Sequence, residues 1–206
     1  MLRRLASHPA TTRQIGVSLI ETMIGIAIVS MVLMFGAPTF TLWLQNTQTR
    51  TAAESIQNGL QLARAEAVKR NTAVRFALTN AAGQIAWTVG CVTVTADCPA
   101  AIQSRSATEG GTNARAGVSI DAIPNPAPAG QFSAALAAGT GLPGGVSFDG
   151  MGRVPSANIG ADITRIDITN AMQAAARRLV VVVGTGGQIR MCDPALALSD
   201  SPQGCV

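Results

Sequence analysis

A single carboxylate, Glu21, stands at the start of a long apolar segment, where a charge is chemically out of place. Between Thr22 and Thr49 there is no ionisable side chain. A helix that used only about twenty of these residues would cross a hydrocarbon core of about 30 Å. A charge within or beside such a helix costs on the order of 2.5 kcal/mol or more unless it is paired. Glu21 is therefore expected to have a cationic partner.

Basic residues come before this segment and set its orientation. Arg3, Arg4 and Arg13 precede every acidic residue of the chain. The positive-inside rule then keeps residues 1–16 cytoplasmic and exports the C-terminal part. A cleaved secretory signal peptide is the alternative, but its apolar region is usually about 7 to 15 residues long. The run here is longer and has no A-x-A-like site before Trp43, so the sequence favours a membrane-spanning segment that stays in the protein.

The residues around Glu21 resemble the class III leader of type IV pilins and type II secretion pseudopilins. Gly16 is followed by Val17-Ser18-Leu19-Ile20-Glu21, where the family commonly has G, F, T, L, I, E. The resemblance implies that a membrane aspartic protease, the prepilin peptidase, cuts between Gly16 and Val17 and methylates the new amine of Val17. Val17 replaces the usual phenylalanine, and Thr22 stands where leucine is common. Gly16 and Glu21, the two positions that matter most, are both kept.

The resemblance also gives Glu21 a partner. In the family, the processed amine of a neighbouring subunit neutralises this carboxylate, which a cation stabilises in lipid. Repetition of that head-to-tail contact builds an open helical assembly. Gly36 and Pro38, the latter matching a proline of many such helices, are expected to kink or locally melt the helix. A proline that the membrane helix simply tolerates is the alternative interpretation.

Residues 54–71 have the periodicity of an amphipathic helix. An apolar stripe at i, i+4, i+7 and i+11 suits packing on a head domain; its members are Ile56, Leu60, Ala63 and Ala67. Glu66 and Arg70 form an i, i+4 pair in the favourable order, and Asn71 is an acceptable helix stop.

The sequence of this helix resembles one branch of the pilin-like proteins in particular. GLQLARAEAVKRN followed by the strand-like TAVRFAL is similar to the GspH/FimT branch of pilin-like proteins. The late segment RMCDPALALSDSPQGCV is more similar to the type IV pilus members FimT and FimU than to the secretion member.

Beyond Asn71 the periodicity becomes alternating, which predicts a β-rich head at 72–206. Strands are expected at 74–78, 84–95, 118–120, 146–148, 163–169 and 177–183, with a glycine-rich hairpin turn at 184–187 leading into a last strand. A Pro/Ala/Gly-rich stretch at 122–145 is expected to be a long surface loop.

The predicted fold class is therefore α+β. A long N-terminal helix, 17–71, with a transmembrane and assembly part at 17–44 and an amphipathic part at 45–71, packs on a sandwich-like head, as in the family. Residues 1–16 are the leader peptide.

The four cysteines form two local pairs on the exported side, Cys91 with Cys98 and Cys192 with Cys205. Disulfides are the natural interpretation, although three connectivities are open. Each bridge could contribute about 2 to 4 kcal/mol. A zinc site is the competing interpretation and is weak, because there is no CxxC and the one histidine, His8, lies in the leader.

Catalytic patterns are absent from the sequence. It has no G-x-S-x-G, P-loop or H-E-x-x-H pattern, and no histidine remains once the leader is removed. Asp162 and Asp167 are expected to be solvated acids rather than a catalytic pair. We expect no enzyme activity, no cofactor and no metal.

Nucleic acid is a rival partner, because FimT members are associated with DNA capture in natural transformation and with a basic G-R-x-R motif. The corresponding stretch here is Gly187-Gln188-Ile189-Arg190, with one of the two arginines. Arg177, Arg178 and Arg190 are candidate DNA-binding residues, or else a solvated strand edge that discourages aggregation. Without the leader, twelve basic side chains face eleven acidic ones, and the net charge falls from +4 to +1.

These features predict a minor pilin of a type IV pilus, anchored once in the bacterial inner membrane with its head in the periplasm and later part of the pilus at the cell surface. As in the family, its expected partners are the prepilin peptidase, other minor and major pilins, the inner-membrane assembly platform and the lipid bilayer. The alternatives are a DNA-binding minor pilin for DNA uptake and a pseudopilin of the type II secretion system.

Overall fold

The computed structural model describes residues 16–109 and 111–206, and gives the backbone only for residues 35–38 within the helix. The predicted leader, apart from Gly16, lies outside these residues. The chain divides into two units, with the boundary between Phe40 and Thr41. Each unit is described by itself.

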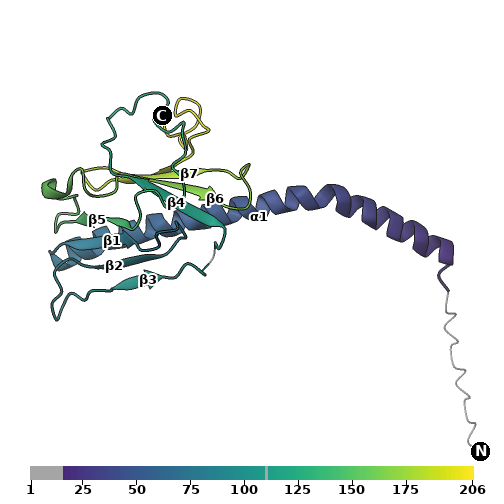
Figure 1. Ribbon diagram of the computed structural model, residues 1–206, viewed down its shortest axis with the longest axis horizontal. Coiled ribbons are helices and arrows are strands. Elements are labelled where there is room, and N and C mark those ends of the chain that lie inside the picture. Colours follow the sequence, from purple (N-terminus) through teal and green to yellow (C-terminus); the bar gives the residue numbers. More distant parts are fainter. Residues whose placement is uncertain (1–15, 110) are drawn as a thin grey trace, which may run out of the picture. The chain divides into compact units, whose positions relative to one another are not determined.

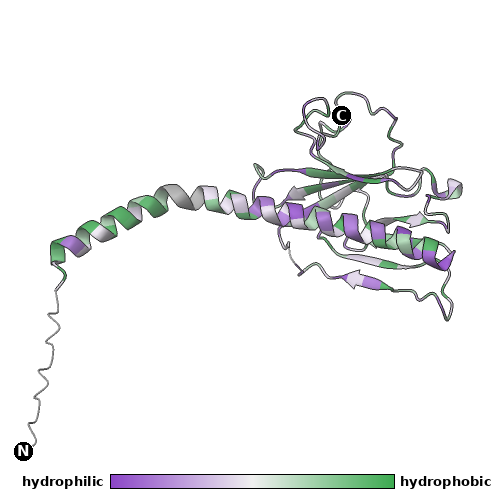
Figure 2. Cartoon of the chain, turned by 180° about the vertical axis from the view of Figure 1, so that it is seen from behind, coloured by the Kyte–Doolittle hydropathy of each residue, from purple (hydrophilic) through white to green (hydrophobic). Residues whose placement is uncertain are grey.

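One helix, α1 (Leu19–Arg70), contributes to both units. In the first unit its large apolar side chains from Leu19 to Met34 are between 55% and 77% exposed, and Figure 2 shows hydrophobic colours along this part of α1. Among the described residues no single helix meets the length and hydropathy criteria for crossing a membrane, although the pieces Leu19–Met34 and Thr39–Arg70 meet them together. The predicted kink at Gly36 and Pro38 falls on residues whose side chains lie outside the description, so it stays a prediction.

The C-terminal part of α1 packs on the head through the predicted stripe. Ile56, Leu60, Ala63 and Ala67 all have 0% exposed surface. The helix ends where predicted, because Asn71 adopts a left-handed φ of 49°, which asparagine tolerates better than most residues. The Thr72 N–H then donates to the Ala67 carbonyl at 3.2 Å and closes the last turn.

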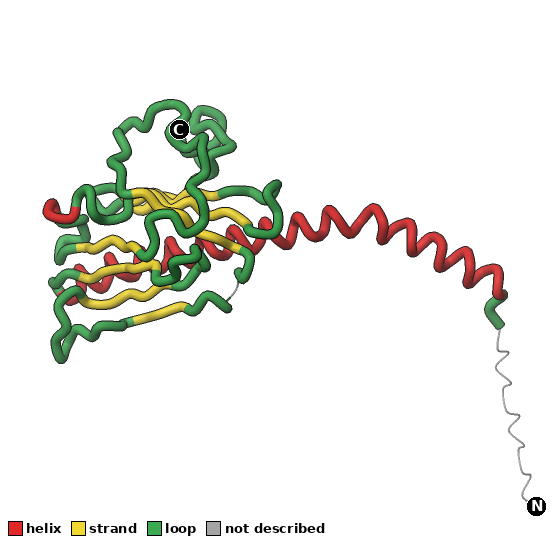
Figure 3. The backbone as a smooth tube through the Cα atoms, viewed as in Figure 1, coloured by secondary structure: helices red, strands yellow, loops and turns green. Residues whose placement is uncertain are grey.

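The head contains two four-stranded antiparallel sheets, which Figures 1 and 3 show beside the C-terminal part of α1. The first sheet has the order β3-β2-β1-β5, with β1 Val74–Leu78, β2 Trp87–Cys91, β3 Gln103–Arg105 and β5 Gly144–Phe148. The second has the order β4-β6-β7-β8, with β4 Ala114–Ser119, β6 Arg165–Asn170, β7 Leu179–Val183 and β8 Ile189–Cys192. A short 3-10 helix, η1 (Ser156–Asn158), precedes β6.

Helix and sheets share one hydrophobic core. Phe76 of β1 lies opposite Val146 of β5 in the register and is fully buried. Its ring centroid is 5.8 Å from that of Trp87, and the Trp87 Nε1–H donates to Ser55 Oγ on α1 at 3.0 Å. The predicted α+β class, a helix packed on a two-sheet head, is confirmed.

The predicted hairpin turn joins β7 to β8. Gly187 has a φ of 79°, and a Cβ placed on it would lie 1.9 Å from the Gly152 carbonyl oxygen. Only glycine fits this position, because both the dihedral angle and the close approach exclude a side chain.

The loop and the C-terminal tail build a second, smaller hydrophobic cluster beside β7 and β8. Its buried members are Phe132, Val180, Cys192 and Cys205. Residues 122–143 contain no helix or strand, as predicted, and the last two residues of the predicted loop begin β5.

Candidate functional site

The N-terminal end of α1 presents Glu21 on an apolar surface. Ser18 begins the helix, since its carbonyl accepts hydrogen bonds from the Glu21 N–H at 3.0 Å and the Thr22 N–H at 3.2 Å. Glu21 lies in the first turn, where the positive end of the helix dipole favours a carboxylate. Its neighbours Leu19 and Ile20 are 77% and 66% exposed.

Glu21 has no ion-pair partner within residues 16–109 and 111–206. Gly16 and Val17 are exposed and non-helical, directly before the helix. The peptide bond between Gly16 and Val17, where cleavage is predicted, and the carboxylate of Glu21 are thus within six residues of each other, on a surface that the first unit itself does not cover.

Both predicted cysteine pairs are bonded in the head. Cys91 joins Cys98 with a Cα–Cα distance of 5.7 Å, and Cys192 joins Cys205 with a Cα–Cα distance of 5.0 Å. The second bridge holds the C-terminal tail against β8, where the Asp193 N–H also donates to the Gln203 carbonyl at 2.7 Å.

A buried ion cluster on β6 and β7 replaces the solvated acid expected at Asp167. The carboxylate has no exposed surface. Arg165 Nε donates to Asp167 Oδ1 at 2.6 Å, and Arg178 Nη1 donates to Asp167 Oδ2 at 2.7 Å. Because water cannot reach this carboxylate, two guanidinium groups are needed to satisfy it.

The same arginines fasten the loop to the second sheet. Arg165 donates to the carbonyls of Gln131 at 3.0 Å and Ala134 at 2.7 Å, and its guanidinium carbon lies 5.1 Å from the centroid of the Phe132 ring. Arg178 donates to the Phe132 and Ser133 carbonyls. The side chain of Arg178 is only 18% exposed, so its interpretation as a solvated edge residue is wrong.

Asp162 is also buried rather than solvated. It is 4% exposed and accepts hydrogen bonds from Arg75 Nη1 at 2.7 Å and from the Ser147 N–H at 2.7 Å. Asn158 Nδ2 donates to the same carboxylate at 2.9 Å. Asp162 therefore ties the segment before β6 to β1 and β5, and no catalytic pair with Asp167 is needed to explain either acid.

The three candidate DNA-binding arginines have three different sets of partners. Arg177 pairs with Asp193, while its N–H donates to Asn46 Oδ1 at 2.7 Å. Arg190 Nη2 donates to the carbonyls of Gly204 and Cys205 in the tail. Arg178 belongs to the buried cluster with Asp167.

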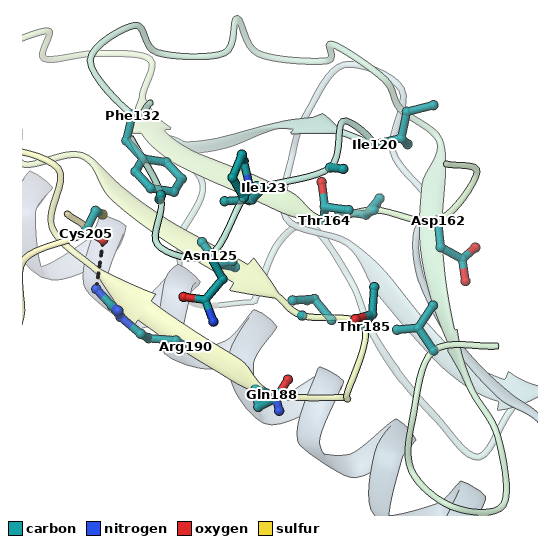
Figure 4. Close-up of a pocket in the computed structure, with 18 of the residues that line it drawn as sticks. Ile120, Ile123, Asn125, Phe132, Asp162, Thr164, Thr185, Gln188, Arg190 and Cys205 are labelled. Carbon is teal, nitrogen blue, oxygen red and sulfur yellow. Dashed lines mark hydrogen bonds between the residues drawn. The ribbon is translucent and has the colours of Figure 1, made fainter. Parts of the chain in front are cut away.

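Arg190 lines a cavity of the head with a volume of about 650 Å³. Figure 4 shows Ile123, Asn125 and Phe132 of the loop above the strand that carries Arg190, with the hydrogen bond from Arg190 to Cys205 at one end. The walls are mostly apolar. The lining residues include no histidine and no free cysteine, and their one side-chain carboxylate is that of Asp162.

No group of three or more potential metal ligands occurs in the part of the chain that the structure describes. The Asp167 cluster was not predicted, although the sequence of β6 contains a signal for it. In the run Arg165-Ile166-Asp167-Ile168, strand alternation places both charges on the face opposite two isoleucines that belong to the core. The local pattern does not show that the loop around Phe132 covers this outer face of the sheet.

A long N-terminal helix whose last turns pack on two antiparallel sheets defines the pilin and pseudopilin class. Within that class the chain belongs to the GspH family: the sequence model described as "Type II transport protein GspH" matches residues 52–187. The structure is similar to the type IV minor pilin FimU of Pseudomonas aeruginosa, with 17% identity, a TM-score of 0.44, and coverage of 80% of this chain and 99% of that one. It is also similar to the minor pseudopilin EpsH of Vibrio cholerae, with 12% identity, a TM-score of 0.44, and coverage of 73% and 99%. No curated protein matches the chain.

Proposed function

We propose that this protein is a minor pilin of a type IV pilus and that it primes or caps pilus assembly together with other minor pilins. The observation that carries the proposal is the first turn of α1. There Glu21 projects from an otherwise apolar and exposed helix, five residues after Gly16. A structural subunit that inserts into a membrane and then packs against like helices needs this combination.

In the proposed sequence of events, prepilin peptidase cleaves between Gly16 and Val17 and methylates the new amine. The inner-membrane assembly platform then brings the subunit beside a neighbour in the growing filament. Glu21 pairs with an N-terminal amine across the subunit contact, which removes the cost of an unpaired charge in an apolar environment. The head contributes contacts with other pilins and performs no catalysis.

The test is the intact mass of the full chain extracted from membranes, with and without its prepilin peptidase. Active peptidase is expected to remove residues 1–16 and add one methyl group to Val17. Retention of residues 1–16 in the presence of active peptidase would contradict the proposal.

A pseudopilin of the type II secretion system is the second candidate, and the description of the matching family favours it. Both candidate functions require the same cleavage after Gly16, but they predict different effects when the gene is deleted. Deletion of the gene should reduce pilus number if the protein is a minor pilin. Loss of exoprotein release with normal piliation would instead assign it to secretion.

A further inference from the structure

A second cavity of about 440 Å³ lies between α1 and the second sheet, within the unit that begins at Thr41. Trp43 and Arg50 of α1 line one side, and Leu179, Arg177 and Met191 line the other. Leu179 belongs to the main hydrophobic core and Met191 packs against it, so the cavity lies at the edge of that core.

The cavity offers hydrogen-bond donors to an anion. Arg50 uses Nε to bind Glu54 at 2.8 Å, and Arg177 uses Nε to bind Asp193. Neither arginine uses its Nη groups in a hydrogen bond with another described residue, and the two side chains are 69% and 45% exposed. Asn46 accepts a hydrogen bond through Oδ1, which leaves its amide N–H groups as further donors.

The acid in the cavity is already satisfied. Asp193 is 4% exposed on its side chain and accepts hydrogen bonds from Arg177 and from the Ala195 N–H at 2.8 Å. Each arginine is thus paired with one carboxylate through its Nε, Arg50 with Glu54 and Arg177 with Asp193, and the Nη groups of both remain as donors, which suit the oxygens of an anion.

The cavity also lies at the point of α1 where the apolar segment ends. Trp43 is 60% exposed and belongs to the last apolar residues before the polar run from Gln45 to Arg50. Tryptophan is enriched at membrane–water interfaces, where its ring lies at the level of the headgroups. The donors of Arg50 and Asn46 follow within two turns, which is the level of lipid phosphates.

We propose that this cavity binds the headgroup phosphate of an anionic phospholipid, phosphatidylglycerol, in the outer leaflet before the subunit is assembled. The proposal rests on the proposed function, because the anchor brings the cavity to the bilayer surface. The Nη groups of Arg50 and Arg177 bind the phosphate, and Trp43 contacts the glycerol and the upper acyl chains. A zwitterionic headgroup is disfavoured, since its cation would find no unpaired carboxylate in the lining.

The test uses the full chain in phosphatidylcholine vesicles that contain phosphatidylglycerol, with a nitroxide quencher near the ester group of one lipid or the other. Trp43 reports the contact, because the other tryptophan, Trp87, is 4% exposed inside the head. Phosphatidylglycerol should quench more strongly than phosphatidylcholine, with a relative affinity increased about fivefold by each arginine. Arg50→Gln should lower that preference about fivefold.

Arg153→Gln is the matched control, because it removes the same charge from an exposed site elsewhere on the head and should leave the preference unchanged. Equal preference in wild type and Arg50→Gln, or an equal loss in both variants, would overturn the lipid site. Equal quenching by the two lipids in wild type would overturn it too, but would leave the anchor and the proposed function intact. No quenching by either lipid would contradict the anchor itself.

Discussion

Three acids of this chain show how the surroundings of a carboxylate decide its role. Glu21 lies on an exposed apolar helix with no ion-pair partner among the described residues. Asp167 is buried between Arg165 and Arg178. Glu66 lies on the amphipathic part of α1 and pairs with Arg70 at 2.6 Å. We expect the first to pair with another subunit, whereas the second and third stabilise the chain that contains them.

Asp167→Asn should destabilise the head by about 3 to 5 kcal/mol, because it leaves two guanidinium groups buried without their counter-charge. Loop residues 131–136 should lose protection from hydrogen exchange at the same time, since Asp167 also accepts the Leu136 N–H at 3.1 Å. Chemical denaturation measures the first effect. Asp200→Asn, at an exposed position, is the control and should change stability by less than about 0.5 kcal/mol. Similar losses in both variants would show that the cluster contributes little.

Glu66 gives a pH-dependent prediction. The hydrogen bond from Arg70 is the main cause that lowers the pKa of Glu66 below its ordinary value of 4.5. The pair therefore stabilises the fold above pH 4.5 and loses its contribution as the pH falls through the lower folded-state pKa.

Glu66→Gln should cost about 0.5 kcal/mol near neutral pH, where the pair is partly screened by solvent. The difference from wild type should shrink as the pH falls through 4.5 and below, because the unfolded state takes up a proton at Glu66 before the folded state does. Unfolding midpoints at several pH values measure this. A difference that stayed constant into strong acid would exclude the ion pair as its cause.

At the scale of elements, the spacing of apolar residues correctly predicted which face of a helix or strand is buried. The stripe from Ile56 to Ala67 is buried because a 3.6-residue period repeats one helix face. The alternation in 74–78 gave β1, with its apolar side chains inward. The stop at Asn71 and the turn before Ile189 followed from backbone preferences that single residues express.

The elements that sequence missed depend on contacts made elsewhere in the chain. β3 (Gln103–Arg105) is an edge strand without buried side chains, and it exists because its backbone pairs with β2. The strand predicted at 84–95 is shorter in the structure, since the bridge from Cys91 to Cys98 ends β2 in a turn. The loop was predicted, but its attachment was not. The Asp167 cluster joins β6, Arg178 before β7 and the loop, and no short stretch of sequence shows that these three segments meet.

Removal of the bridge between Cys192 and Cys205 by a double serine substitution should destabilise the head by about 3 kcal/mol, the entropy of closing a loop of this length. The bridge spans 13 residues. Its loss frees the tail that supplies the carbonyl acceptors of Arg190. Guanidinium unfolding measures the change. The corresponding substitution of Cys91 and Cys98, which are 7 residues apart, should cost about 2.5 kcal/mol. An unchanged wild-type midpoint under reducing conditions would contradict both values.

At the scale of the whole molecule, the distribution of basic residues on the head argues against DNA binding. Strong phosphate binding needs a clustered basic surface, whereas Arg177, Arg178 and Arg190 are engaged with separate partners. We therefore expect the full chain in detergent to leave duplex DNA unshifted at submicromolar concentration and low salt. A shift that Arg190→Ala abolishes would contradict this and favour DNA uptake.

In the proposed function, assembly is the whole-molecule property that depends on Glu21. Glu21→Gln keeps the size of the side chain and removes the charge, so a neighbour's amine loses a charge-assisted hydrogen bond of about 1.5 to 3 kcal/mol. Incorporation into pili should fall at least about tenfold, measured as the ratio of subunit in sheared pili to subunit in membranes. Thr22→Leu, which adopts the common family residue at the next position, is the control and should assemble normally.

The intact mass of each variant separates assembly from processing, because a loss of cleavage after Gly16 would also keep the subunit in the membrane. Glu21→Gln should therefore be cleaved and yet remain unassembled. If the cleaved Glu21→Gln protein entered pili as well as wild type, the pairing of Glu21 with an amine would not set the position of the subunit. The apolar surface of α1 would then have to determine that position through packing alone, although such a surface allows neighbouring helices to slide past one another with little change in energy.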